Sequence, residues 1–235
     1  MSEELPLDFA QVPMDILVIL IADMLDRLMA HNDLIPLLPE SLTRFHSRTA
    51  PSISVLDYLR RIVRYTNVEK SCLLLTLHYI DQICARMPRF TLSSLTCHRF
   101  IIASITVSSK GLCDTFCTNN LYAKVGGISV SELNVLEREF LDKIDWRIMC
   151  TRDLLQEYYV NLVRTHTSGK YYVIGTQSSV GSASDDGDEM DTTQSRPPTP
   201  AVGSAILIDL NRPVEVKPTI EQNMAFAALQ ELDKD

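Results

Sequence analysis

Residues 92–111 read LSSLTCHRFIIASITVSSKG, and this stretch decides the fold class. Apolar side chains leave no broad polar face on it, and Ser, Thr and Ala fill the positions between them. The apolar residues are Phe100, Ile101, Ile102, Ala103, Ile105 and Val107. A helix that is apolar on all sides is a buried helix. The β-branched residues would also suit a strand. However, the length of the run and its helical neighbours favour a central helix over 92–109, ended by Gly111.

Amphipathic helices are predicted on both sides of this central helix. Their ranges are about 13–31, 52–63, 68–87, 121–125, 129–144 and 151–166. Ser52 or Ser54 can cap the second of them, and Asn67 can cap the third. Ser129 and Glu132 have the spacing of a capping box. The predicted fold class is therefore all-α, a helical bundle around one buried helix.

The composition changes near residue 175. From Thr176 to Gly203 the chain is rich in Ser, Thr, Asp, Gly and Pro, and too little apolar surface remains to offset the entropy of ordering. We expect a disordered acidic linker there, followed by a short C-terminal amphipathic segment within 206–235. The predicted organisation is an N-terminal helix and linker over 1–40, the main helical domain over 41–150, a C-terminal helix over 151–175, and the acidic linker and short segment over 176–235.

Charge and cysteine usage exclude several classes of protein. The net charge of −8 argues against non-specific nucleic-acid binding, which needs clustered Lys and Arg. The first residues are acidic, so no secretory signal is expected, and the apolar run 16–22 is too short to span a membrane. None of the six cysteines forms a CxxC pair. We expect a soluble intracellular protein with reduced cysteines, and a disulfide framework is the less favoured alternative.

No enzyme motif is present: GxGxxG, GxxxxGK[ST], HExxH and GxSxG are all missing from the sequence. His78 and His98 lie in apolar helices, where a hydrogen-bonded core histidine is favoured over a ligand. Cys113 and Cys117 flank Asp114, but no second pair of ligands follows them, so a metal site is the weaker interpretation. The sequence predicts no cofactor, no metal and no catalytic residue.

One carboxylate occupies an unexpected position. The apolar residues of the predicted 129–144 helix form a stripe that comprises Leu133, Leu136, Phe140, Leu141 and Ile144. Glu137 falls within this stripe, where a charge is costly unless it is paired. Lys110, at the end of the central helix, is the best internal partner, although a plain helix-end lysine is the alternative. Asp114 lies just past the same helix end, where an anion also needs a cation unless it is simply solvated.

Several short motifs resemble the cyclins, and among them the phosphate-system cyclins of fungi, which have relatives in plants and protists. The resemblance covers about residues 41–150. The motifs are Phe45-His46, Pro51-Ser52-Ile53-Ser54, Tyr79-Ile80-Asp81, His98-Arg99-Phe100, Lys110-Gly111-Leu112-Cys113-Asp114 and Tyr122-Ala123-Lys124-Val125-Gly126-Gly127.

The resemblance implies a single five-helix cyclin box over 41–150 whose third helix is buried, with flanking N- and C-terminal helices. It further implies that Lys110 and Glu137 form a polar hook on the regulatory helix of a cyclin-dependent protein kinase. Asp114 would receive an arginine of the kinase activation segment, in place of activation-loop phosphorylation. The implied protein is thus not an enzyme but the regulatory subunit of a kinase heterodimer.

The resemblance also implies partners and a location. A phosphate-responsive transcription factor would be the substrate and an ankyrin-repeat protein the inhibitor, with no direct nucleic-acid or membrane contact. The expected location is the nucleus, with the cytoplasm as a second site. Thr199-Pro200 fits a minimal proline-directed phosphorylation site, a motif too common to carry weight.

Two alternatives remain at this stage. The first is a single-box cyclin-fold scaffold that activates no kinase, and the second is a small α-helical enzyme. The sequence also departs from cell-cycle cyclins, because 51–55 reads PSISV where they carry a hydrophobic substrate-docking patch. Another surface would then recruit substrates, near Arg60, Arg61 and Arg64, unless these form a solvated helix face.

Overall fold

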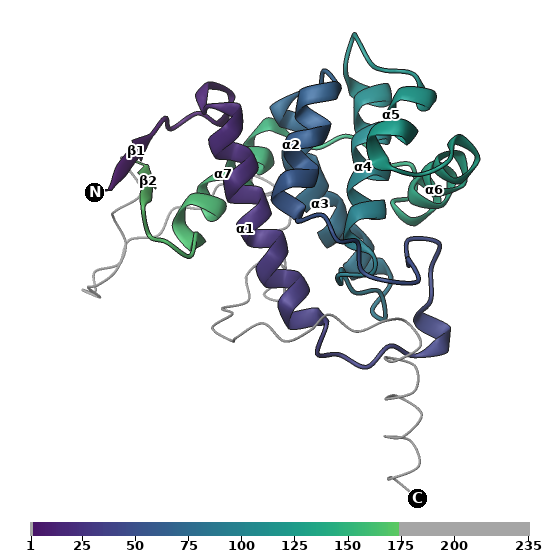
Figure 1. The fold of residues 1–235 in the computed structure, drawn as a ribbon. Helices are drawn as coiled ribbons and strands as arrows, with labels where there is room; N and C mark the ends of the chain where they lie inside the picture. The colour runs from purple at the N-terminus through teal and green to yellow at the C-terminus, as the bar shows by residue number, and fades with distance from the viewer. Residues whose placement is uncertain (1, 174–235) are drawn as a thin grey trace, which may run out of the picture.

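The structure is a computed structural model that describes residues 2–173. Within that range seven α-helices follow one another, with a short strand at each end (Figure 1). The elements are β1 (Glu3–Leu5), α1 (Met14–Asn32), α2 (Val55–Tyr65), α3 (Lys70–Arg86), α4 (Cys97–Leu112), α5 (Asn119–Gly126), α6 (Val130–Lys143), α7 (Arg152–Thr165) and β2 (Tyr171–Val173). The expected acidic linker and C-terminal segment of 176–235, with Thr199, lie outside the described residues.

Helix α4 is the buried centre of the bundle, as the sequence predicts. Every residue from Cys97 to Ser109 except Arg99 is buried. Helices α2, α3, α5 and α6 all contact α4. Several hydroxyl groups inside the core have partners nearby: Thr106 donates to the Ile102 carbonyl at 2.7 Å, and the Thr76 and Ser104 hydroxyls lie 3.0 Å apart. A buried hydroxyl without a partner would cost about 1–3 kcal/mol, so these bonds make the polar fillers tolerable.

Three predicted helix boundaries are wrong. Helix α4 begins at Cys97 and not at Leu92, because the Thr96 hydroxyl accepts the Ser93 N–H and closes a turn ahead of the helix. Gly111 does not end it: α4 continues to Leu112, with Gly111 packed under the Ile148 side chain. Helix α3 begins at Lys70, so Asn67 is not its cap.

An aromatic cluster joins α3, α4 and α6 and positions the site described below. The ring centroids of Phe100 on α4 and Phe140 on α6 lie 5.2 Å apart, and those of Tyr79 on α3 and Phe140 lie 5.3 Å apart. Phe45, fully buried, inserts between them from the connection that follows α1. Such edge and tilted ring pairs add to the stabilisation that burial itself provides.

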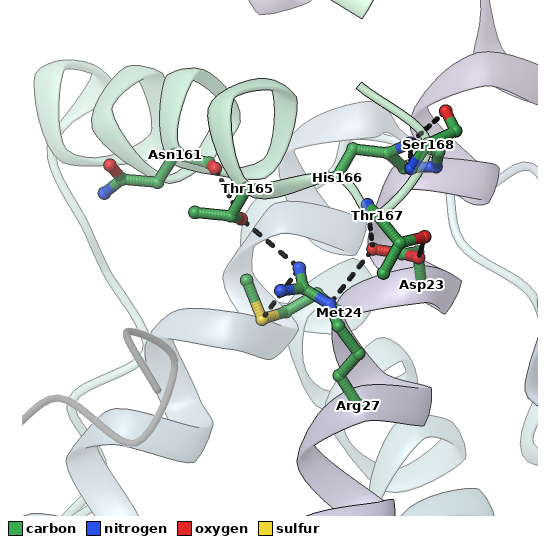
Figure 2. Close-up of polar contacts among 8 residues, drawn as sticks. All are labelled: Asp23, Met24, Arg27, Asn161, Thr165, His166, Thr167 and Ser168. Carbon is green, nitrogen blue, oxygen red and sulfur yellow. Dashed lines mark hydrogen bonds and ion pairs between the residues drawn. The ribbon is translucent and has the colours of Figure 1, made fainter. Parts of the chain in front are cut away.

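The two ends of the described chain lie together, away from α6 (Figure 1). β1 and β2 form a short parallel pair, which the sequence did not predict because three residues are too few to show an alternating pattern. Figure 2 shows how the end of α7 is held to α1. Arg27 pairs with Asp23 at 3.1 Å and donates to Thr165, while the Thr167 hydroxyl donates to Asp23. No helix within 2–173 is both long and apolar enough to cross a membrane.

Candidate functional site

Lys110 and Glu137 meet at the surface where α4 ends against α6. The Lys110 Nζ lies 2.5 Å from the Glu137 Oε1, which confirms the predicted pairing. The Glu137 side chain is 16 % exposed and the Lys110 side chain 32 % exposed. The pair is therefore partly withdrawn from water, where attraction between charges is stronger than on an open surface.

The apolar stripe of α6 explains why Glu137 is there. Leu133, Leu136 and Phe140 are fully buried against α4, and Glu137 lies at the edge of their face. Lys110 occupies the last turn of α4, where the helix dipole favours a cation. Each charge thus stands where its partner compensates the cost of partial burial.

Two asparagines complete the site, and sequence reasoning did not find them. The Asn119 side chain accepts a hydrogen bond from Lys110 Nζ at 3.3 Å and donates one to Glu137 Oε2 at 3.0 Å. Its amide nitrogen also donates to the Asn134 Oδ1 at 2.7 Å. Neither residue has a signal of its own, because an asparagine near a helix start or on an exposed helix face is ordinary. The relative placement of α4, α5 and α6 brings them together.

Asp114 lies in the segment between α4 and α5 and is exposed. It has no ion pair or hydrogen bond to any residue described in the structure, so its carboxylate faces solvent and no cation within residues 2–173 pairs with it. Contacts of the neighbouring residues Cys113 and Cys117 anchor this segment to the rest of the domain. The Cys113 sulfur packs 3.4 Å from the Cys72 sulfur, and the Cys117 N–H donates to the buried Tyr122 hydroxyl. Asp114 is therefore presented outward from an anchored segment.

Exposed apolar side chains accompany these charges. Leu112, Phe116 and Leu121 lie in the segment from the end of α4 into α5, and Phe116 is 56 % exposed. Met149, 79 % exposed, follows Ile148, whose side chain contacts Gly111. Apolar residues around a few polar anchors are typical of protein–protein interfaces. The surface is thus suited to a protein partner.

The remaining candidate residues have structural roles. The His98 Nε2 lies 3.0 Å from the Ile53 carbonyl oxygen, and the His78 Nε2 accepts from Gln82. His98 is a buried, hydrogen-bonded histidine as predicted, whereas His78 is hydrogen-bonded but only half-buried. All six cysteines are free thiols, and burial raises the pKa of the Cys113 thiol. Within residues 2–173 no three His, Cys, Asp or Glu side chains are arranged to hold a metal ion. Arg60 pairs with Asp57, Arg61 donates to the Lys124 carbonyl, and these two residues and Arg64 are exposed on α2.

Comparisons with known proteins give a family for this chain. The sequence profile of the family described as Cyclin matches residues 15–148. The chain is 48 % identical over 158 residues to the Nuc-1 negative regulatory protein preg of Neurospora crassa, covering 66 % of this chain and 33 % of that protein. It is 43 % identical over 149 residues to the PHO85 cyclin PHO80 of Saccharomyces cerevisiae, covering 62 % and 51 %. With Cyclin-U4-1 of Arabidopsis thaliana the identity is 32 % over 154 residues, covering 64 % and 76 %. The chain thus spans a third and about half of the length of the first two relatives.

Proposed function

Because the chain belongs to the cyclin family, we propose that it is the regulatory subunit of a cyclin-dependent serine/threonine kinase, which it binds and activates. The observation that carries this proposal is the Lys110–Glu137 pair at the junction of α4 and α6, together with the exposed apolar side chains of the segment that follows Lys110 along the chain. A partly buried charge pair near exposed apolar side chains can bind the backbone of a docked helix, because it offers one hydrogen-bond donor and one acceptor.

Asp114 has a separate role in this proposal. It carries a full charge on an anchored segment and lacks an internal partner within the described range. An arginine of the kinase activation segment would form a charge-assisted hydrogen bond with it. The same arginine would otherwise need a phosphate on the kinase, so Asp114 would order the activation segment without phosphorylation. Lys110 and Glu137 therefore serve binding, and Asp114 serves activation.

The proposed process is phosphate-responsive control of transcription, and the names of the relatives support it. One is a PHO85 cyclin and another a negative regulatory protein of Nuc-1. A transcription factor would then be the kinase substrate, an ankyrin-repeat protein the inhibitor, and the nucleus the site of action. The arginines of α2 are not required by this scheme.

The test uses purified chain and the kinase PHO85 of Saccharomyces cerevisiae, after which the second relative is named. Lys110→Ala and Glu137→Ala are each expected to weaken binding about tenfold or more, the cost of leaving one charge of a half-buried pair alone. Glu139→Ala, on the same helix but paired only with Lys143 at 3.5 Å, is the matched control and should change affinity little.

Activation is measured in the same preparation. With the cyclin saturating, Asp114→Asn is expected to lower the kinase turnover number far more than it lowers affinity. Asp15→Asn removes an exposed carboxylate from the first turn of α1 and controls for charge. Binding without any gain in kinase activity would favour the scaffold alternative. Unchanged binding in the Lys110 and Glu137 variants would reject the site.

A further inference from the structure

The Asn119 side chain makes three hydrogen bonds within the site: both amide hydrogens are donated, and the amide oxygen accepts one bond. Lys110 can only donate and an ionised Glu137 can only accept, so the orientation of the amide between them is determined: its oxygen faces Lys110 Nζ and its nitrogen faces Glu137 Oε2. The second amide hydrogen goes to the Asn134 Oδ1 at 2.7 Å. Asn134 lies on α6, one turn before Glu137, so the amide of α5 is held by two residues of α6.

Asn119 is not needed to begin α5. It is the first residue of that helix, and Thr118 already caps it, because the Leu121 N–H donates to the Thr118 Oγ1. Asn120 beside it is exposed and lies in the same first turn. The side chain of Asn119 is therefore free to serve the site rather than the helix.

We propose that Asn119 is a positioning residue of the kinase-binding site. Held by Asn134, it hydrogen-bonds to both members of the Lys110–Glu137 pair and orients their remaining groups toward the partner. Lys110 has three N–H donors and spends two of them here. Each carboxylate oxygen of Glu137 accepts one hydrogen bond from within the chain and has a second lone pair.

The network thus leaves one donor and vacant acceptor positions side by side. This is the complement of a free backbone C=O and a free backbone N–H. A helix leaves C=O groups unpaired in its last turn and N–H groups unpaired in its first turn. The proposal deepens the proposed function and rests on it, because the partner groups belong to the kinase.

The decisive variant is Asn119→Asp, compared with Asn120→Asp. Both add one negative charge to the first turn of α5, where the helix dipole favours an anion. If the Asn119 side chain had no role beyond the first turn of α5, the two variants would therefore behave alike. A positioning role predicts a difference, because an aspartate cannot donate to Glu137 or Asn134 and repels the Glu137 carboxylate. It also attracts Lys110 away from Glu137.

Binding to purified PHO85 and thermal unfolding of the free chain are both measured. We expect Asn119→Asp to weaken binding about tenfold or more, with Asn120→Asp within about twofold of the unchanged chain. The unfolding midpoints of both variants should stay within about 2 °C of the unchanged chain. Asn119→Ala and Asn134→Ala should show smaller losses of affinity, since they remove hydrogen bonds without adding repulsion.

The outcomes separate the two proposals. If the unchanged chain does not bind the kinase, the proposed function fails and this inference fails with it. If the unchanged chain binds and Asn119→Asp binds equally well, the inference fails and the proposed function stands. Should Asn119→Asp lower the unfolding midpoint markedly, Asn119→Ala decides by the same comparison with Asn120→Ala, and equal affinities there overturn the inference.

Discussion

At the scale of single residues, this chain places charge where burial makes it depend on a partner. Lys110 and Glu137 each compensate the charge of the other, Asn119 hydrogen-bonds to both, and Asn134 accepts a hydrogen bond from Asn119. Lys143 and Glu139 form a second ion pair on α6, of (i, i+4) spacing and with the longer distance of 3.5 Å. The coupling free energy of the Lys110–Glu137 pair can therefore be compared with that of the Lys143–Glu139 pair in the same protein.

A double-mutant cycle on the free chain tests this difference. Lys110→Met and Glu137→Gln are expected to couple by about 1 kcal/mol or more in the free energy of unfolding, because either change leaves a half-buried charge alone. Lys143→Met and Glu139→Gln should couple by about 0.5 kcal/mol or less, as (i, i+4) helix pairs do, because their charged atoms lie 3.5 Å apart instead of 2.5 Å and Glu139 is more exposed than Glu137. Urea denaturation measures both cycles, and equal coupling in the two pairs would contradict the argument.

His78 gives the fold a predictable pH dependence. Burial lowers the pKa of His78 below its ordinary value of 6.5. Below pH 6.5 the unfolded chain therefore binds a proton that the folded chain does not, so the free energy of unfolding falls as the pH drops through that range. The stabilisation is fully present above pH 6.5. His78→Gln should flatten the fall between pH 7.5 and pH 5.5 in urea unfolding; an unchanged slope would show that His78 does not contribute.

At the scale of elements, close packing of α5 on α4 determines where the site residues lie. A Cβ atom at Gly126 would lie 2.8 Å from the Ile102 Cγ1, so glycine allows the two helices to approach. Gly127 follows with φ +72° and ends α5 in the left-handed conformation, and no atom lies within 4 Å of a Cβ placed there. The two adjacent glycines thus answer different requirements, one of space and one of backbone conformation.

Substitution of each glycine by alanine should separate these requirements. Gly127→Ala is expected to cost about 1–2 kcal/mol of unfolding free energy from backbone strain, wherever its neighbours are. Gly126→Ala should cost about 1–3 kcal/mol through overpacking. It should also weaken kinase binding, because α5 carries Asn119. Adding Ile102→Ala should recover part of the affinity lost in Gly126→Ala and none of that lost in Gly127→Ala, as measured by binding to PHO85.

At the scale of the whole molecule, the described chain closes on itself at the end opposite the site. Asp23 of α1 receives the Arg27 side chain and both the N–H and the hydroxyl of Thr167, beyond α7 (Figure 2). β1 and β2 pair next to this junction. The junction therefore holds α7 and β2 to the first helix without involving α4 or α6.

Loss of that junction should be a local event. Asp23→Asn removes the charge that Arg27 faces, and the side chains of the pair are each 15 % exposed. We expect faster amide hydrogen exchange in residues 3–5 and 166–173, with protection of α4 unchanged, because opening there need not disturb the core. Asp15→Asn, an exposed change on the same helix, is the control. Equal loss of protection in α4 would mean that the ends and the core open together.

Much of the fold and part of the site could be predicted from the sequence. The apolar run 100–107, the caps Ser54 and Ser129, and the misplaced Glu137 each have a local pattern that reports burial or a helix start. Lys110 could be proposed as the partner of Glu137 because the helix dipole favours a cation at the end of α4 and because an unpaired, partly buried charge is costly. These inferences succeed because periodicity and charge compensation act over a few residues.

Other features were decided by the tertiary structure. Helix α3 starts at Lys70 rather than after Asn67, and α4 starts after a turn closed by Thr96. Asn119 joins Lys110 and Glu137 because α5 packs on both α4 and α6, and an amide side chain has no property that announces such a bridge. The sequence by itself thus determined which faces are buried and which charge needs a partner. Packing of distant helices determined which neutral polar groups complete the site, since a hydrogen bond depends on positions that local patterns do not encode.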